Sequence, residues 1–342
     1  MTEHSKKIME GARQAVLNCV KLKEGEGVVI ITDLETEALA EAIEKVASEL
    51  TNDIHLFVME DFGDRSEDGS DPLEFPREIV EAMRTSKASF YIAQGKPGEL
   101  KTFRRPMLKF VEEFKLKHAH MIGFEEKMME EGMAADYKAI QALSLKVYNE
   151  VKHAKKIRVT TPSGTDITAE FSPDYKWHIS DGDIRPLHWM NLPDGEVFTA
   201  PKSVNGHVVI DGTLGDYFSE KYGSLDKNPV EFDLKEGEAV KGSIKCKNEE
   251  LKNDLEKYVF GGVENAERVG EFAIGTNIGL DHLIGNLLQD EKFPGVHIAL
   301  GDSYPDKTGA PWHSEHHIDG VMKNTTIIVD DKPLMKDGLF LI

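Results

Sequence analysis

The first part of the chain alternates short apolar runs with amphipathic segments. The run at residues 28–32 is continuous and β-branched, which is typical of a buried strand. The segment after it carries Leu39, Ala42, Ile43 and Val46 at helical spacing. Further strands are expected at 55–59 and 89–93, and further helices at 76–85 and 106–114. Because strands alternate with helices, the pattern predicts a parallel sheet that is covered on both faces.

Residues 61–71, with the sequence DFGDRSEDGSD, interrupt this pattern with acidic and small residues. The segment lacks the ligand spacing and the terminal Glu of a calcium-binding loop. We therefore expect it to form a solvated surface loop.

The pattern changes after residue 156. Gly-rich turns now separate short β-branched runs such as GHVVIDGT and TTIIVDD, and helical patterns remain only at 251–259 and around 281–288. Such a succession predicts a mixed or largely antiparallel sheet domain. With an expected helix at 134–151 leading into it, the chain divides into an N-terminal α/β domain at 1–152 and a C-terminal mixed α+β domain at 153–342.

The composition excludes several classes of protein. The chain has 342 residues, of which 40% are hydrophobic and 30% charged, and its net charge is −20. This surplus of acid argues against a nucleic-acid partner. Cys19 and Cys246 match no metal or redox spacing, and we find neither the apolar core of a signal peptide nor an apolar run long enough to span a membrane. We therefore expect a cytoplasmic protein.

Candidate chemistry is concentrated in the second half, where ionisable side chains stand inside short apolar runs. Residues two apart on a strand point to the same face, so His317 and Asp319 are expected to project together while Ile318 packs behind them. His297 and Glu271 each stand in a similar apolar run. The full candidate set is Glu196, Glu271, Glu291, His297, His317 and Asp319.

Each of these residues alone has a plain structural explanation, as a solvated Glu at a strand end or a hydrogen-bonded His. Several charged groups in apolar runs are nevertheless unfavourable unless they are paired or bind a cation. Four carboxylates would balance two divalent ions, and six ligands are too many for one tetrahedral zinc. Carboxylate and imidazole ligands without thiolate suit Zn, Co or Mn. We therefore expect two divalent metal ions. His313 and His316 could add ligands, but a solvated approach to the strand is the preferred interpretation.

Six motifs over most of this chain resemble the M29 metallopeptidases, a family of thermophilic aminopeptidases. They are GEGVVIITD, VTTPSGTDIT, NLPDGEVFTAP, GEFAIGTN, DEKFPGVHIALGDSY and HHIDGVM, and they lie in the family's order. The resemblance implies that the six residues above are the metal ligands and that Tyr304 is an active-site tyrosine. It also implies a homodimer that hydrolyses short peptides, with Glu271 as general base, Tyr304 as donor to the oxyanion and Glu196 as a bridge between the metals.

The chain differs from the peptidases of that family in three respects. Gly195 stands where the peptidases often have a second Glu, the chain is shorter, and one more residue separates Glu291 from His297. A shorter relative of the fold is an iron-dependent ring-opening dioxygenase, which has a His where this chain has Glu271. The leading interpretation is a metalloaminopeptidase. The alternatives are a mononuclear iron oxygenase and a catalytically degenerate metal-binding member of the fold.

Overall fold

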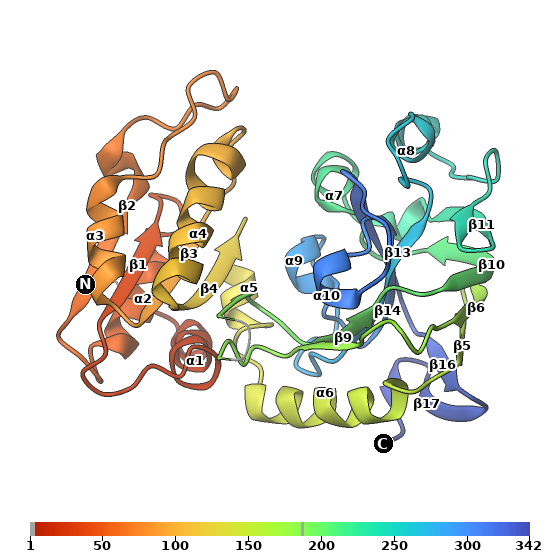
Figure 1. Cartoon of the computed structure of the whole chain (residues 1–342), viewed down its shortest axis with the longest axis horizontal. Coiled ribbons are helices and arrows are strands. Elements are labelled where there is room, and N and C mark those ends of the chain that lie inside the picture. Colours follow the sequence, from red (N-terminus) through yellow and green to blue (C-terminus); the bar gives the residue numbers. More distant parts are fainter. Residues whose placement is uncertain (1–3, 186–187) are drawn as a thin grey trace. The chain divides into compact units, whose positions relative to one another are not determined.

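The computed structural model describes residues 4–185 and 188–342 and contains two compact units. Unit 1 comprises Met1–Ala139 and Gly182–Asp194, and unit 2 comprises Ile140–Asp181 and Gly195–Ile342. Figure 1 labels the helices and strands of both units. The domain boundary expected between residues 152 and 153 remains a prediction.

A parallel sheet forms the centre of unit 1, as predicted. Its strand order is β2-β1-β3-β4-β8, and each pair of neighbours is parallel. The strands are β1 Val28–Thr32, β2 Ile54–Val58, β3 Ala88–Ala93, β4 Lys117–Ile122 and β8 Trp189–Asn191. All residues of β1 and β3 are buried. A strand that is buried on both faces needs a continuous apolar run, which explains why these two segments do not alternate with polar residues.

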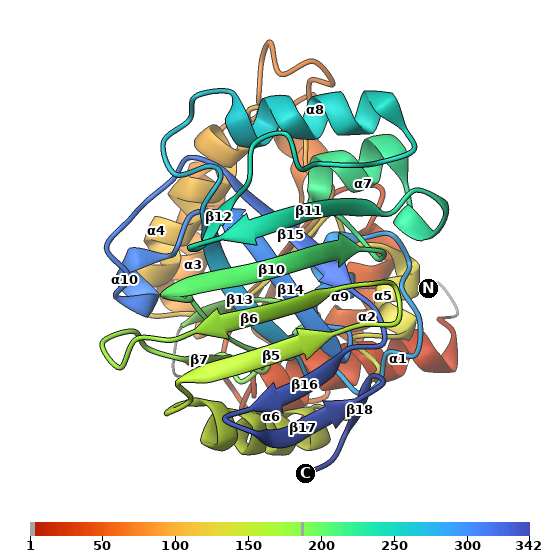
Figure 2. The same cartoon turned by 90° about the vertical axis from the view of Figure 1, so that its right-hand side faces the viewer.

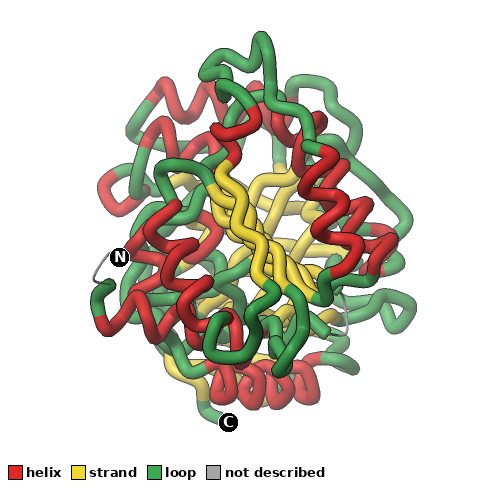
Figure 3. The backbone as a smooth tube through the Cα atoms, turned by 90° about the vertical axis from the view of Figure 1, so that its left-hand side faces the viewer, coloured by secondary structure: helices red, strands yellow, loops and turns green. Residues whose placement is uncertain are grey.

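Helices lie on both faces of this sheet (Figure 3). They are α1 Lys6–Arg13, α2 Glu37–Ala47, α3 Arg77–Thr85, α4 Arg105–Phe114 and α5 Glu126–Glu130. Short π-helical turns follow α1 at Gln14–Cys19 and precede α4 at Leu100–Arg104, and a 3₁₀ turn spans Met59–Phe62. Helix α1 packs on α2 and α5, and α3 packs on α4. The predicted helices 76–85 and 106–114 thus correspond to α3 and α4, and each predicted boundary agrees with the observed one to within one residue.

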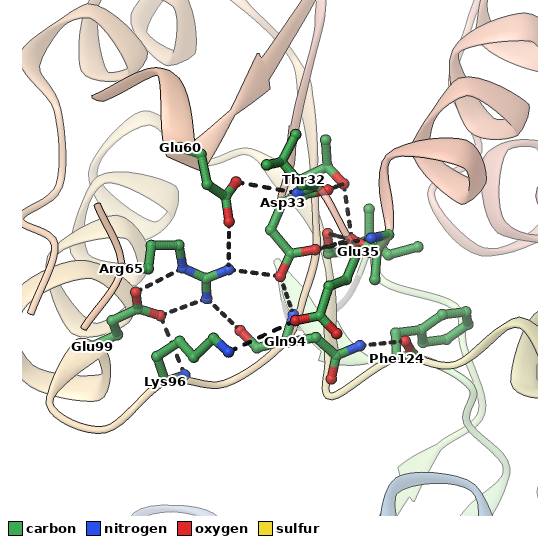
Figure 4. Close-up of polar contacts among 12 residues, drawn as sticks. Thr32, Asp33, Glu35, Glu60, Arg65, Gln94, Lys96, Glu99 and Phe124 are labelled. Atoms are coloured by element: carbon green, nitrogen blue, oxygen red, sulfur yellow. Dashed lines mark hydrogen bonds and ion pairs between the residues drawn. The ribbon is translucent and has the colours of Figure 1, made fainter. Parts of the chain in front are cut away.

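The acidic loop at 61–71 differs from the prediction most clearly at Arg65. The Arg65 side chain is only 3% exposed and lies within a network of carboxylates (Figure 4). Its guanidinium donates to Asp33 Oδ2 at 2.7 Å, to both oxygens of Glu99 and to the carbonyl oxygen of Gln94. Asp33 follows β1 and Gln94 follows β3, so Arg65 fastens the loop to the carboxyl ends of two neighbouring strands. The expectation of a fully solvated loop was therefore wrong for Arg65.

Two antiparallel sheets form unit 2, as the change in pattern predicted. The eight-stranded sheet has the order β12-β11-β10-β6-β5-β16-β17-β18 (Figure 2). Its strands are β5 Lys156–Thr160, β6 Asp166–Glu170, β10 Ser203–Ile210, β11 Val230–Lys235, β12 Glu238–Ala239, β16 Thr326–Val329, β17 Lys332–Lys336 and β18 Leu339–Phe340. The five-stranded sheet has the order β15-β14-β13-β9-β7. Its strands are β7 His178–Ser180, β9 Glu196–Thr199, β13 Val269–Gly275, β14 Gly295–Gly301 and β15 His317–Met322.

The hydrophobic core of unit 2 contains buried side chains from both sheets. The five-stranded sheet contributes alternate residues, among them Phe272, Ile298 and Ile318. Gly320 on β15 shows how closely the sheets approach, because a Cβ atom there would lie 2.6 Å from Ile210 Cδ1 on β10. One face of the five-stranded sheet is thus committed to the core, and only the other can carry a functional site.

Two helices of unit 2 are long, α6 Tyr137–Val151, which begins in the last residues of unit 1, and α8 Glu249–Phe260. The others are the short helices α7 Asp216–Tyr222, α9 Leu287–Asp290 and α10 Pro305–Thr308 and a 3₁₀ turn at Leu225–Lys227. The helix considered around 281–288 begins only at Leu287, and the residues before it form a loop. Within residues 4–185 and 188–342, no helix is long and apolar enough to cross a membrane.

Candidate metal centre

The candidate residues on strands project from one face of the five-stranded sheet. In antiparallel strands, directly opposed residues point to the same side. Glu271 is opposed to Ala299, which is opposed to Asp319 on the next strand. His297 is opposed to Ala273, and Ala273 is opposed to Phe198. Glu196 and His317 lie in phase with these rows, so the strand register places Glu196, Glu271, His297, His317 and Asp319 on one face.

Small residues separate the ionisable ones on this face. Ala299 lies between Glu271 and Asp319, and Gly301 is paired with His317. These small side chains leave room for the longer acidic and imidazole groups to converge. The residues between them on β13, β14 and β15, including Phe272, Ile298 and Ile318, point into the core instead. Alternation of ionisable and apolar residues along these strands, together with Glu196 on β9, therefore builds the site.

The side-chain atoms converge around His297 and His317. His297 Nε2 lies 3.5 Å from Glu196 Oε2, 3.7 Å from Glu271 Oε1 and 3.9 Å from Asp319 Oδ1. His317 Nε2 lies 3.3 Å from Glu271 Oε2 and 3.4 Å from Asp319 Oδ2. Separations of this size are those expected between neighbouring ligands of a divalent ion with bonds of roughly 2.0–2.2 Å.

Three overlapping groups of donor atoms could each hold an ion, the atoms of each group lying within 4.8 Å of one another. The groups are Glu196–Glu271–His297, Glu271–His317–Asp319 and Glu291–His297–Asp319. Every one of the six residues singled out in the sequence belongs to at least one group. His313 and His316 belong to none of them. His313 pairs with Asp302, and His316 stacks on Tyr258 with ring centroids 3.9 Å apart.

His317 is oriented by its surroundings. Its Nδ1 lies 3.2 Å from the carbonyl oxygen of Asp302, which can only accept a hydrogen bond, so the proton belongs on Nδ1 and the lone pair on Nε2. The hydroxyl of Tyr258 on α8 holds the backbone of His317 through both its N–H and its carbonyl oxygen. Such outer contacts fix the ring plane of a metal ligand.

The donor set fits a divalent cation by its burial and by its unsatisfied atoms. Glu271 is 5% exposed, Asp319 6% and His297 2%. Among the described residues, three buried side-chain polar atoms lack a hydrogen-bond partner, and two of them are Glu196 Oε2 and His297 Nδ1 in this cluster. The third is the Tyr91 hydroxyl in unit 1. A buried acceptor without a donor is unfavourable, and a cation bound by this cluster would relieve that penalty for Glu196 Oε2.

The protonation states reflect the excess of carboxylates. Burial disfavours the charged form of His297, but Glu271, Glu196 and Asp319 outweigh it and raise the pKa of His297 to about 9. The pKa of His317 is raised well above its ordinary value against the same opposing effect of burial. Burial would raise the pKa of Glu271, yet its contacts with the two histidines hold that pKa below the usual range. Without a metal, protons on the histidines therefore neutralise part of the acidic charge.

Glu291 reaches the cluster from outside the sheet. It caps the C-terminus of α9, which is anchored because Asp290 accepts hydrogen bonds from the backbone N–H groups of Ile284 and Gly285 and from the Thr213 hydroxyl. Burial raises the pKa of Glu291 to about 8, although the adjacent Lys292 acts in the opposite direction.

Lys292 was not identified from the sequence, although it follows Glu291 directly. Its side chain is 4% exposed, and its Nζ lies 2.7 Å from Glu196 Oε1 and 2.7 Å from Glu291 Oε1. A lysine in the otherwise apolar segment KFPGV, next to a candidate ligand, was the available signal.

Tyr304 lies beside the cluster in a left-handed backbone conformation, with φ 50° and ψ 62°. Its ring centroid is 4.7 Å from that of His317 and 6.4 Å from that of Phe198. Non-glycine residues in this region are uncommon and often mark functional positions. The structure thus places Tyr304 next to the candidate ligands, where the sequence pattern alone would have suggested only a turn.

Gly195, one of the departures noted in the sequence, has a steric explanation. Its φ is +137°, and a Cβ atom there would lie 2.9 Å from the backbone nitrogen of Asn277. Its carbonyl oxygen accepts a hydrogen bond from Thr276 N at 2.7 Å. A Glu at this position would need a different path for the loop at residues 276–277.

Comparisons with known proteins agree with this picture. The family described as thermophilic metalloprotease (M29) matches residues 128–333. The structure of 2,5-dihydroxypyridine dioxygenase from Pseudomonas putida KT2440 has a TM-score of 0.68 at 14% identity, covering 99% of this chain and 98% of that one. Wild-type AmpT from Thermus thermophilus has a TM-score of 0.68 at 18% identity, covering 98% and 99%. No curated protein matches the chain. At these identities the two structures establish a shared fold.

Proposed function

The chain belongs to the M29 family of metalloproteases, and from this we propose that it is a metal-dependent aminopeptidase that removes N-terminal residues from short peptides. The observation that carries the proposal is the convergence of Glu196, Glu271, His297, His317 and Asp319 on one face of a sheet, with the buried Glu196 Oε2 left without a hydrogen-bond partner. Family membership alone gives metal-dependent proteolysis. The convergent donor set supports placing the metals here.

We propose that the six candidate residues hold two divalent ions, Zn, Co or Mn, with Glu196 as a bridge. When bound, such ions would lower the pKa of a water molecule towards neutrality and polarise the scissile carbonyl group. His317 would bind through Nε2, because its Nδ1 proton is directed to Asp302. His297 Nε2, which faces three carboxylates, would be the donor atom of the second imidazole.

The proton transfers are assigned to Glu271 and Tyr304. Glu271 would accept a proton from the attacking water on a carboxylate oxygen and pass it to the leaving amine, and it could also act as a ligand, since it belongs to two donor groups. The Tyr304 hydroxyl would donate a hydrogen bond to the oxyanion. Burial and the surrounding carboxylates raise the pKa of Tyr304 well above its ordinary value, so it remains a donor at neutral pH.

The decisive experiment compares matched peptides that differ only at the N-terminus. Protein stripped of metal with a chelator is reloaded with Zn, Co or Mn and given a free-amine peptide and its N-acetylated twin. We expect metal-dependent cleavage of the free-amine peptide only. Cleavage of both forms would contradict an aminopeptidase, and cleavage of neither by the loaded protein would contradict a peptidase of any kind.

A second candidate is a mononuclear iron oxygenase, favoured by the equal TM-score of the dioxygenase structure. Oxygenases of that class bind iron through two histidines and one carboxylate, and His297, His317 and Asp319 could form such a set. Four carboxylates at the site make this the weaker candidate. Iron content after purification and oxygen uptake with an aromatic substrate would reveal it. The homodimer and the cytoplasmic location remain predictions, the first of which sedimentation would check.

A further inference from the structure

We propose that Lys292 makes the two metal positions unequal, so that an ion at Glu271, His317 and Asp319 binds tightly and a second ion binds weakly. The proposal rests on the metal dependence proposed above. It concerns a residue of this chain that belongs to none of the three donor groups. Lys292 would act on the number of bound ions, because its ammonium group already pairs with one oxygen of each of two carboxylates, Glu196 and Glu291, that a second ion would use.

The contacts of Lys292 are selective. Its Nζ lies 2.7 Å from Glu196 Oε1 and 2.7 Å from Glu291 Oε1, and these carboxylates belong to different donor groups. The group Glu271–His317–Asp319 contains neither of them. Competition from the ammonium is therefore confined to two of the three groups and leaves the third intact.

Burial makes this competition effective. The Lys292 side chain is 4% exposed and that of Glu196 is 9% exposed, so water screens their interaction poorly. A lysine this deep in a protein is rarely found unless its charge is paired. Replacing the ammonium at Glu196 by a divalent ion would leave Lys292 with one fewer anionic partner, which opposes binding of the second ion.

Charge counting leads to the same result. Metal ligands bind as neutral imidazole and ionised carboxylate, and in those forms Glu196, Glu271, Glu291 and Asp319 together with the ammonium of Lys292 carry three net negative charges. One divalent ion reduces this to a single negative charge, whereas two ions give a net positive charge before any anionic ligand binds. Without Lys292, two divalent ions would bring the same carboxylates to neutrality. The lysine thus lowers the electrostatic attraction for the second ion more than for a first ion in the group that it does not touch.

The backbone holds Lys292 in place. Its N–H donates to the carbonyl oxygen of Gln289 at 3.0 Å, and its own carbonyl oxygen accepts from Asn277 N at 3.0 Å. Asp290 fastens the preceding turn. The backbone N–H and carbonyl groups of Lys292 are both hydrogen-bonded. The ammonium could therefore move away from Glu196 and Glu291 only by a change in the side-chain conformation of Lys292.

The test measures metal binding directly, by calorimetric titration of stripped protein with Zn²⁺ and Mn²⁺ and by metal content after gel filtration. In the unmodified chain we expect one tight site and a second site weaker by about 10–100-fold, the range of effects seen for residues just outside a metal's ligands. Lys292→Met should tighten the second site and narrow this gap. Lys292→Arg keeps the positive charge and should preserve the gap.

Two results would overturn the proposal. One is a pair of equally tight sites in the unmodified chain, and the other is a gap that Lys292→Met leaves unchanged. Circular dichroism would show whether each variant folds. If Lys292→Met does not fold, the ratio of the two affinities in the unmodified chain decides whether the proposal holds. Failure of the proposed function is distinguishable, since it would appear as a lack of peptide cleavage whatever the ratio of the two affinities.

Discussion

Each unit of this protein buries a cluster of charges, and the two clusters differ in how completely their members are paired. In unit 1, Arg65 donates to Asp33, to both oxygens of Glu99 and to the carbonyl of Gln94 (Figure 4). The other oxygen of Asp33 accepts hydrogen bonds from the backbone and the hydroxyl of Thr36. In unit 2, Glu196 Oε2 and His297 Nδ1 have no hydrogen-bond partner among the described residues.

The location of the Arg65 network makes this difference instructive. In the strand order β2-β1-β3, the connection after β1 leads to β2 on one side of β1, and the connection after β2 leads to β3 on the other side. The point where the direction of the connections reverses is the usual ligand site of an open parallel sheet. Here Arg65 and its carboxylates occupy it. Fold position alone would therefore have suggested a ligand site in unit 1, whereas the convergence of several candidate ligands indicates one in unit 2.

The histidines of the two units differ in the same sense. His118 and His120 on β4 are buried, and they contact Ser89, Tyr91, Trp189 and each other. Burial lowers the pKa of His118 to about 3 and that of His120 well below its ordinary value. His297, equally buried, has a raised pKa because carboxylates surround it. Burial therefore sets no fixed direction for a histidine, and its neighbours decide whether it carries charge.

The largest expected effect is on turnover and comes from breaking the unit 2 cluster. Glu271→Gln removes the general base and a ligand, and should lower kcat by about 10²–10⁴-fold or more. His317→Ala should likewise abolish peptide hydrolysis. Initial rates with the metal-loaded variants measure both effects. Glu315→Gln is the matched control, because Glu315 is exposed two residues from His317. Unchanged turnover in Glu271→Gln would refute the assignment of the base.

Breaking the unit 1 cluster should affect stability and leave chemistry alone. Arg65→Met leaves Asp33 and Glu99 buried without their cation, which should destabilise the fold by about 3–5 kcal/mol. Urea unfolding measures this loss. The control Arg77→Met removes a guanidinium that is 91% exposed and should change stability by less than about 0.5 kcal/mol. We expect metal binding to be unchanged in the folded Arg65→Met protein. Loss of metal binding in this variant would show that the two clusters depend on each other.

Metal should stabilise one cluster and not the other. A divalent ion at about 100 times its dissociation constant should raise the stability of the fold that binds it by about 2.7 kcal/mol. Thermal unfolding with and without Zn²⁺ or Mn²⁺ measures this. We expect the shift in the unmodified chain and in Arg65→Met, and its loss in His317→Ala. A shift that survives in His317→Ala would place the ion elsewhere.

Acid should destabilise unit 1 through its neutral histidines. Because the folded pKa of His118 is depressed, the unfolded chain binds more protons below about pH 6.5, and stability falls as the pH is lowered from there towards about 3. The expected loss is about 1.4 kcal/mol per pH unit for each such histidine. Urea unfolding between pH 7.5 and 5, followed by Trp189 fluorescence in a Trp177→Phe, Trp312→Phe background, measures the slope. His118→Gln should reduce the slope.

The sequence predicted the architecture where hydrophobic periodicity was unambiguous. The continuous run at residues 28–32 and the one at 89–93 became the buried strands β1 and β3, and the short runs after residue 156 became antiparallel sheets. The alternation His317-Ile318-Asp319 also correctly implied that both ionisable side chains share a face, because strand geometry alone fixes that relation.

The sequence could not predict features that depend on remote partners. Arg65 lies in an acidic, Gly-containing loop, and only its contact with Asp33 and Glu99 makes it a buried residue. Lys292 is equally ordinary until Glu196, far away in the sequence, is found beside it. The expected helix around 281–288 was also incorrect, since Asp290 holds the backbone of that segment as a loop. Each miss concerns a side-chain contact across the fold, which local periodicity does not encode.

The alternation on β13, β14 and β15 also governs which changes in chain length the protein can accept. An insertion of one residue within β14 before His297 would turn His297 into the hydrophobic core and bring a neighbouring residue to the face that carries the candidate ligands. Compared with the peptidases that this chain resembles, one extra residue separates Glu291 from His297. It can be accommodated in the turn at 292–294, because β14 begins at Gly295. The side chains of β14 then keep their alternation between the two faces of the sheet. Related chains should therefore vary in length at the turns between these strands and keep the number of residues within each strand constant.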